Sequence, residues 1–388
     1  MKVQSHLYRV QFFTLLAVVS IVVFQYELLM LDRHVPLTLA LNIFTVSQVL
    51  NVLTIIFLSR RDFQIKTQNK ILQFSLVVRT ITIAAMFFTQ NSWLFIGMFL
   101  VYQNLSSINI MFEGMIAQWS FEKETSFSRI RFWGSVGFSV AGFLATLIFD
   151  ITGVLNNLLL LVFVVNIFNT IIAFKVPVDS SQPKAEKQNS STKIPLKYKG
   201  LLVFGGAMMA FPNSFSVILN NHYREIFGLG IEQAIFFVSL TVLLGSFVSE
   251  FFAFFSVDRL IRRYKSVNII FVGIVLSAVR WFVALVAWDP VLFALSYLFH
   301  GFSFVFAYIG CVSLIKEKIG NQFTSKLIME FVIISNGLNI LMIQLTNVVM
   351  NFFTSIFLVG LYALLSVVAG VVYIHFAKRY LNTAQGES

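Results

Sequence analysis

The chain has 388 residues, of which 58% are hydrophobic and only 12% are charged, and its mean hydropathy is +0.84. Soluble domains carry about 25% charged residues, so this composition excludes a soluble enzyme. The 45 phenylalanines exclude a disordered chain, and the single cysteine, Cys311, excludes a disulfide scaffold. Because the apolar runs are long and continuous, they also exclude a membrane β-barrel. A helical membrane protein with many spans remains.

Twelve apolar runs meet the length of roughly 20 residues that a helix needs to cross a bilayer. The first run is long and has no small-residue cleavage site, so we interpret it as a span and not as a cleaved signal. We expect an all-α integral membrane protein with twelve transmembrane helices. The predicted spans are 9–31, 37–58, 71–88, 92–117, 131–150, 155–174, 200–220, 231–255, 267–286, 290–311, 327–347 and 351–376.

The net charge of +11 follows from the placement of the basic residues and does not indicate a nucleic-acid partner. With the N-terminus placed inside, 24 of the 28 Lys and Arg residues fall in segments predicted to be cytoplasmic. Only Arg33 and Arg224 fall in predicted outer loops, and Arg79 and Arg280 lie within spans. This asymmetry is a strong positive-inside signal. We therefore expect a multi-pass protein of the cell membrane with both termini in the cytoplasm.

A long polar stretch at residues 175–199, rich in Ser, Lys and Gln, separates the spans into six and six. This composition is typical of a flexible linker. We expect an N-terminal six-helix bundle at 1–174, a cytoplasmic linker at 175–199 and a C-terminal six-helix bundle at 200–388. The layout resembles the major facilitator superfamily, whose two bundles rock about a site near the membrane midplane.

The segment 258–263, with the sequence DRLIRR, lies between spans 8 and 9 and resembles the D-R-x-G-R-R loop of the same superfamily. Ile261 stands where glycine is usual. In the superfamily this loop makes charged contacts that steady one conformation. The alternative is that the charges only anchor the segment at the cytoplasmic surface. The latch residues that the resemblance implies are Asp258, Arg259, Arg262 and Arg263.

A pair of opposite charges lies at the hairpin of spans 4 and 5. Glu113 and Arg131 are equally distant from residue 122, so an antiparallel hairpin places them at the same depth. A guanidinium there can pair with the carboxylate, or bind a solute hydroxyl or carboxylate with two hydrogen bonds. The spacing alone favours a plain salt bridge at the cytoplasmic edge.

The segment from Glu113 to Phe138 resembles the lactose permease type of oligosaccharide:proton symporter. It is still more similar to the related phenylpropionate-permease-like branch, through the sequence RIRFWGSVGF at 129–138. In the lactose permease type, a glutamate and an arginine with the spacing of Glu113 and Arg131 hold the sugar. An aromatic residue at the position of Phe138 stacks on the sugar ring. The resemblance therefore implies that these three residues contact a solute.

A second set of polar residues lies in spans 8, 9 and 10. The rise of the helices places Arg280 and His300 within roughly 5 Å of each other in depth. The lactose permease type has an arginine and a histidine with the same spacing, and Glu250 matches a carboxylate of its coupling region. The resemblance implies that Glu250, Arg280 and His300 carry coupling. The alternative for His300 is a neutral packing residue.

One departure from the symporters puts proton coupling of the lactose type in doubt. Ser303 stands where those proteins have their proton-carrying glutamate, and a serine hydroxyl does not take up a proton at physiological pH. Either His300, which titrates near neutral pH in water, or Glu250 would have to carry the proton instead.

These observations predict a secondary active transporter for a sugar, nucleoside or aromatic acid that works by alternating access with proton symport. The sequence has no phosphate loop, zinc spacing or nucleophilic triad, so we expect no enzyme activity, catalytic residue, cofactor or metal. We expect the partners to be the solute, protons and lipid, without nucleic acid, and the functional unit to be a monomer. Asn336 in span 11 is a further candidate for solute contact. The alternatives are an exporter of sugars or amphipathic compounds and a receptor that does not transport.

Overall fold

A computed structural model of the chain describes residues 2–61, 65–123, 125–176, 196–319 and 324–380, and the regular elements in these ranges are helices. The helices through residue 175 are α1 (Lys2–Phe24), α2 (Tyr26–Asp32), α3 (Leu37–Ser59), α4 (Ile65–Phe88), α5 (Ser92–Ser106), α6 (Asn109–Glu122), α7 (Phe127–Thr152) and α8 (Asn157–Lys175). The later elements are α9 (Leu196–Ser216), α10 (Leu219–Phe227), α11 (Ile231–Val242), the π-helical segment η1 (Leu243–Ser249), α12 (Glu250–Tyr264), α13 (Ser266–Leu285), α14 (Pro290–Ser296), α15 (Leu298–Ile319), α16 (Thr324–Phe352) and α17 (Ser355–Tyr380).

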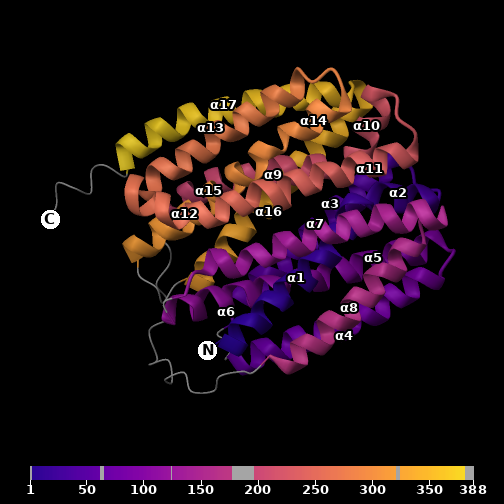
Figure 1. Cartoon of the computed structure of the whole chain (residues 1–388), viewed down its shortest axis with the longest axis horizontal. Helices are drawn as coiled ribbons and strands as arrows, with labels where there is room; N and C mark the ends of the chain where they lie inside the picture. The colour runs from indigo at the N-terminus through magenta and orange to yellow at the C-terminus, as the bar shows by residue number, and fades with distance from the viewer. Residues whose placement is uncertain (1, 62–64, 124, 177–195, 320–323, 381–388) are drawn as a thin grey trace.

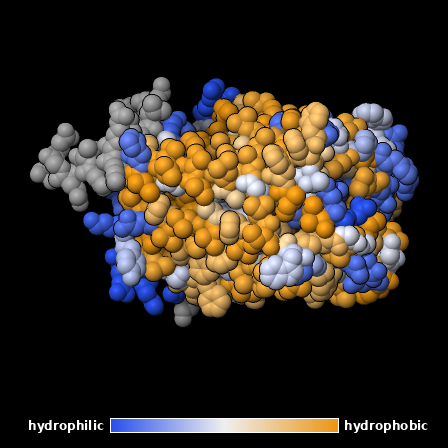
Figure 2. Space-filling model, turned by 90° about the horizontal axis from the view of Figure 1, so that it is seen from above, coloured by the Kyte–Doolittle hydropathy of each residue, from blue (hydrophilic) through white to orange (hydrophobic). Residues whose placement is uncertain are grey.

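Within the described ranges, eleven helical segments are long and apolar enough to cross a membrane, and a twelfth results when the bent pair α9–α10 is counted as one span. Figure 2 shows the matching surface, a broad hydrophobic band with hydrophilic residues gathered at both ends. Such a band is what contact with lipid requires. The predicted class of a multi-pass, all-α membrane protein is therefore confirmed.

The seventh predicted span, 200–220, is wrong as a single helix. Helix α9 ends at Ser216, and α10 turns away from it by 61°. Pro212 lies inside α9 and lacks the N–H that would continue the hydrogen-bond ladder, which weakens the helix near this point. Spans 1, 4 and 10 are also divided, into α1 and α2, α5 and α6, and α14 and α15.

The predicted loop at 258–263 is helical, and the prediction of a loop there is wrong. Helix α12 continues to Tyr264, so that α11, η1 and α12 form one segment of 34 residues. Arg262 and Arg263 lie in the last turn of α12, where positive charge complements the partial negative charge of the helix end. The predicted linker 175–199 is shorter at its C-terminal side, because α9 begins at Leu196, and residues 177–195 lie outside the described ranges.

The helices before the linker and those after it meet along two lines of contact. Helix α7 packs against α11, η1 and α12, and helix α16 packs against α3 and α6. Figure 1 shows the early helices in indigo and magenta below the later ones in orange and yellow. The start of α1 and the end of α17 lie toward one end of the molecule, which we call the terminal end, and α2 and α10 lie at the other, the distal end. The charge asymmetry predicts that the terminal end faces the cytoplasm.

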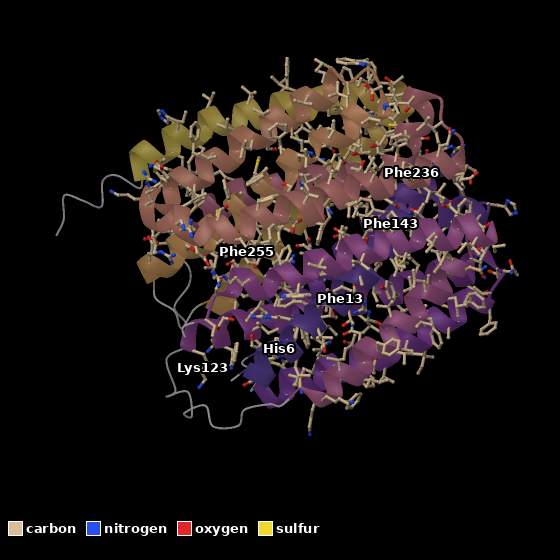
Figure 3. The ribbon with its side chains drawn as sticks, in the orientation of Figure 1. His6, Phe13, Lys123, Phe143, Phe236 and Phe255 are labelled. Carbon is tan, nitrogen blue, oxygen red and sulfur yellow. The ribbon has the colours of Figure 1, made fainter. Side chains whose placement is uncertain are left out.

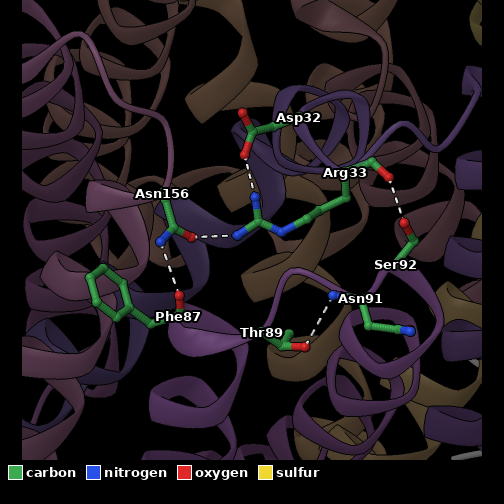
Figure 4. Close-up of polar contacts among 7 residues, drawn as sticks. All are labelled: Asp32, Arg33, Phe87, Thr89, Asn91, Ser92 and Asn156. Carbon is green, nitrogen blue, oxygen red and sulfur yellow. Dashed lines mark hydrogen bonds and ion pairs between the residues drawn. The ribbon is translucent and has the colours of Figure 1, made fainter.

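A polar cluster joins three connections at the distal end (Figure 4). Arg33 donates to Asp32 at 2.5 Å and to Asn156 at 2.6 Å, and Asn156 donates to the carbonyl of Phe87 at 3.0 Å. Ser92 donates to the Arg33 carbonyl at 2.8 Å. The cluster therefore ties the end of α2 to the connections that precede α5 and α8.

Arg79 does not reach toward the membrane surface, the simplest expectation for a long basic side chain in a span. It is buried within α4, and it donates to Asn109 at 3.1 Å and to the hydroxyl of Tyr102 at 3.3 Å. Its guanidinium also lies 4.9 Å from the centre of the Tyr102 ring. Arg79 therefore links α4 to both sides of the break between α5 and α6.

Helices α1 and α7 pack with almost no space between their backbones at Gly137. A Cβ atom at this position would overlap the backbone carbonyl of Phe13 on α1, a residue labelled in Figure 3. Small residues allow this kind of approach between membrane helices. By contrast, Phe143 on α7 and Phe236 on α11 are 52% and 48% exposed, on the surface that lipid would cover (Figure 3).

We expect Gly137→Ala to destabilise the protein by roughly 1–3 kcal/mol, because the added methyl group must push α1 and α7 apart. The matched control is Gly97→Ala, since nothing lies within 4 Å of a Cβ atom at Gly97. The measurement is the midpoint of thermal unfolding of the two variants in detergent. Equal midpoints would contradict the close contact between α1 and α7.

Candidate functional site

A cavity of about 230 Å³ lies where the early and late helices meet. Its walls come from α1 and α7 on one side and from α9, α11, η1, α12 and α15 on the other. The polar and aromatic side chains that line it include Arg131, Ser135, Phe138, Asn213, Glu250, Tyr297, His300 and Phe304. Most ligand sites combine apolar walls with a few convergent polar groups in this way.

The structure brings Glu113 and Arg131 together as an ion pair. Arg131 Nε donates to Glu113 Oε1 at 3.0 Å, from α7 to α6. Tyr308 on α15 donates to the same carboxylate oxygen, also at 3.0 Å. Arg131 Nη1 is buried and has no hydrogen-bond partner within the described ranges. Glu113 therefore holds Arg131 in place, and one face of the guanidinium is left to bind another group.

Glu250 also joins the early and late helices, from α12 to α7. This carboxylate on α12 is only 5% exposed and accepts a hydrogen bond from Ser135 on α7. The charges of Glu250 and Arg131 also attract each other. A buried carboxylate is costly unless such partners are present. The hydrogen bond of Ser135 with Glu250 therefore joins α7 to α12 beside the cavity.

The π-helical segment η1 comes directly before Glu250. Ser249 at the end of η1 donates to the carbonyl of Leu298 at 2.5 Å and accepts from the backbone N–H of Phe302 at 3.3 Å. A Cβ atom at Gly301 would overlap this segment, so α15 lies directly against it. Such irregular turns are frequent at functional sites, and this one fixes Glu250 against α15.

The structure also brings Arg280 and His300 together, beside the cavity. Arg280 Nη1 lies 3.4 Å from His300 Nδ1. The guanidinium is 4.2 Å from the Trp281 ring centre and 4.0 Å from that of Tyr297, so aromatic faces cover it. Arg280 is 1% exposed, and its Nε and Nη2 have no hydrogen-bond partner within the described part of the chain. His300 and Tyr297 line the cavity, and Arg280 lies behind them.

The remaining candidates are divided between the cavity and other places. Phe138 lines the cavity and packs edge-on against Phe24 at 5.4 Å. Asn336 is half-buried on α16 and is not among the residues that line the cavity. Ser303 is buried at 2% exposure on α15. Phe138 therefore lies at the cavity, whereas Asn336 and Ser303 are not among its lining residues.

The residues of the predicted latch behave differently from one another. Asp258 accepts hydrogen bonds from Ser126 at 2.9 Å and from Ser128 at 2.8 Å, at the start of α7. Arg259, Arg262 and Arg263 are exposed. Asp258 therefore closes the terminal end by joining α12 to α7, while the arginines form no part of this contact.

At the distal end, hydrogen bonds join the break between α1 and α2 to the break between α9 and α10. Asn220 on α10 donates to the backbone carbonyl of Phe24 at 2.7 Å. The backbone N–H of Asn221 donates to Glu27 on α2 at 3.0 Å, and Glu27 is 2% exposed. Contacts therefore join the early and late helices at both ends of the molecule, and the cavity lies between these ends.

The sequence did not single out two side chains that shape the site. Tyr308 binds Glu113, and Tyr297 covers Arg280. Both lie on the same span as His300, at +8 and −3 residues from it. These helical spacings would place polar aromatic groups near the face of His300, which is the one signal that could have found them. Within the described ranges, no group of three or more His, Cys, Asp or Glu side chains could hold a metal ion.

Solved structures of transporters share this fold. The chain resembles the nucleoside transporter NupG with a TM-score of 0.69 and 15% identity, over 97% of this chain and 99% of that one. It resembles an auto-inhibited POT family peptide transporter with a TM-score of 0.74 and 11% identity, over 97% of each chain. For a variant of the E. coli fucose:proton symporter FucP the TM-score is 0.65 and the identity 12%, over 96% and 98%. No curated protein matches the sequence significantly.

Up to twelve apolar spans in the described ranges, with a cavity lined by apolar and polar side chains and the fold of these proteins, define a membrane transporter of the MFS type. The family is given by the sequence itself. The chain belongs to the MFS_1 like family, whose sequence model matches residues 8–342.

We expect Arg131→Lys to lower transport by at least about tenfold, which corresponds to about 1.4 kcal/mol. Lysine keeps the charge but lacks the planar fork that holds Glu113 with one edge and offers Nη1 with another. The measurement is the initial rate of solute uptake in proteoliposomes. The matched control is Arg129→Lys, which changes an exposed arginine about half a helical turn away on α7. Full activity of Arg131→Lys would contradict a role for the Arg131 guanidinium in transport.

Proposed function

We propose that the protein carries a small organic solute, a sugar, nucleoside or aromatic acid, across the cell membrane by alternating access and together with protons. The observation that carries this proposal is the cavity of about 230 Å³ between the early and late helices. Drug-sized ligands occupy pockets of roughly 300–1,000 Å³, so this cavity suits a smaller molecule. Its charged groups would bind polar atoms, and its aromatic faces would bind a ring.

In this proposal the early helices supply the main solute contacts. Arg131 offers its unpaired Nη1 to an oxygen of the solute, and Glu113 keeps the guanidinium in position. Phe138 provides an aromatic face on the same helix, two turns away. The similarity of residues 113–138 to the lactose permease and phenylpropionate-permease-like branches supports the same three roles.

Glu250 is the carboxylate that we propose as the proton carrier, in place of the glutamate that Ser303 replaces. It is the acidic side chain in the lining of the cavity, and its hydrogen bond with Ser135 joins α12 to α7. A proton on Glu250 changes the charge at a contact that must separate during transport. This would couple protonation to the change of conformation.

Alternating access would follow from rocking of 1–174 against 200–388, within a single copy of the chain. The Asp258 contacts with Ser126 and Ser128 would open when the cavity faces the cytoplasm. The contact of Glu27 with Asn221 would open when the cavity faces outward. The two sets of contacts lie at opposite ends, so each can break while the other persists (Figure 1).

The test is reconstitution in lightly buffered liposomes, with sugars, nucleosides and aromatic acids added in turn and external pH recorded. We expect one solute class to make the external medium alkaline. In Glu113→Gln this response should be lost, because the substitution removes the carboxylate that pairs with Arg131 and holds its guanidinium in position. Glu232→Gln, which removes an exposed carboxylate at the distal end, is the matched control.

Other outcomes have distinct meanings. Counterflow of a solute without any change of pH would contradict proton symport and would favour export or another coupling ion. Binding of a solute without counterflow would contradict transport itself and would leave a receptor.

A further inference from the structure

Two arginines near the cavity, Arg131 and Arg280, differ in whether an acidic side chain pairs with them. Arg131 has Glu113 as an ion-pair partner and Glu250 nearby. Arg280 has no acidic partner within the described ranges, and two of its nitrogens have no acceptor there. A buried and uncompensated cation is costly inside a membrane. The His300 end of the cavity is therefore set up to attract an anion.

The charged and titratable groups around the cavity define the charge of the whole site. Arg131 and Ser135 on α7 and Ser246 on η1 lie around Glu250. Glu113 on α6 binds Arg131 and Tyr308 on α15, and Arg280 on α13 lies against His300 on α15 and Tyr297 just before it. With His300 and the tyrosines neutral, two carboxylates balance two guanidiniums, and the empty site carries no net charge. Binding of one anion alone makes it negative, and binding of one proton alone makes it positive.

We propose that the solute is a monocarboxylate carried with one proton, so that each transport cycle moves no net charge; this rests on the transport function proposed above. The carboxylate would occupy the end of the cavity formed by His300 and Tyr297, where Arg280 supplies the positive charge. The proton would be on Glu250. Of the four loading states, only the empty site and the site with both anion and proton are neutral.

This balance explains why transport would be coupled. A site with net charge must carry that charge through a region of low dielectric constant when the cavity changes sides. The empty and the fully loaded protein avoid this cost, whereas the two partly loaded forms do not. The anion and the proton would therefore cross together or not at all.

The test uses proteoliposomes and three probes, shikimate, D-gluconate and 4-hydroxybenzoate, with shikimic acid amide, D-glucose and uridine as neutral comparisons. Uptake is driven by an inward proton gradient, and membrane potential is set with potassium and valinomycin. Protein-free liposomes give the background. We expect at least one monocarboxylate to be taken up, at a rate that an imposed potential changes by less than about twofold, since a neutral step has no potential term.

Each other outcome overturns a defined claim. Uptake of a neutral compound in place of the carboxylates would overturn this inference and leave the transport function standing. Uptake of a carboxylate at a rate that rises or falls several-fold with potential would overturn the neutral cycle. Movement of no probe in either direction would overturn this inference and the proposed function together.

Variants of Glu250 and Arg280 test the proposed proton and anion sites separately. We expect Glu250→Gln to lose net uptake but to keep exchange of a carboxylate across the membrane, because its loaded site is neutral and its empty site is positive. Arg280→Gln should lose both net uptake and exchange, and Arg280→Lys should restore part of both. The exposed Arg60→Gln is the control for loss of an arginine.

The exchange assay keeps the test independent of folding. If Glu250→Gln loses net uptake and exchange to the same degree while eluting as a folded monomer, the charge balance is contradicted. If Arg280→Lys is no better than a correctly folded Arg280→Gln, Arg280 does not act through its charge.

Discussion

The ion pair of Arg131 and Glu113 is the interaction on which the site depends. It joins α6 to α7, and Tyr308 extends it to α15, so a single carboxylate connects helices from both halves of the sequence. Paired charges are the form in which a membrane interior tolerates charge at low cost. Because Glu113 takes up one edge of the guanidinium, Arg131 is fixed in direction and can still bind a further group. Arg131 lines the cavity from α7, and Glu250 and His300 line it from the late helices.

The contacts around the cavity are weak enough individually to be exchanged. At the terminal end, two serine hydroxyls bind Asp258, and at the distal end Asn220 and Asn221 bind one carbonyl and one carboxylate. Each hydrogen bond contributes roughly 0.5–1.5 kcal/mol, or up to about 3 kcal/mol with a charged partner. Further hydrogen bonds join α3 to α16, among them those of Asn347 with Asn42 and of Gln344 with Thr45, so an opening of the distal end has to exchange these contacts as well. The distal contacts of Asn220 and Asn221 lie at the breaks between α1 and α2 and between α9 and α10, where the helices are already interrupted.

The sequence predicted the class of fold because apolar length and basic asymmetry are set by the bilayer and not by packing. It also placed Glu113 with Arg131 and Arg280 with His300, since hairpin symmetry and helix rise determine depth. The bend after Ser216, although Pro212 lies one turn before it, and the helical form of 258–263 were not predicted, because apolar length alone located the spans. The partners of Arg79 and the contact of Ser135 with Glu250 were hidden because each joins helices far apart in sequence. Asn336 was chosen for polarity within a span, and polarity alone does not tell which face of a helix meets a cavity.

Alternating access requires that the cavity opens to one end of the molecule at a time. Double electron–electron resonance on two pairs of spin labels tests it most directly, with one pair at Lys123 and Tyr264 at the terminal end and one at Thr152 and Ile231 at the distal end. All four residues are exposed. The first pair joins the connection between α6 and α7 to the end of α12, and the second joins the end of α7 to the start of α11. In liposomes we expect short and long populations for both pairs, and every condition that lengthens one distance should shorten the other. Two distances that lengthen together, or that both stay short in all conditions, would contradict alternating access.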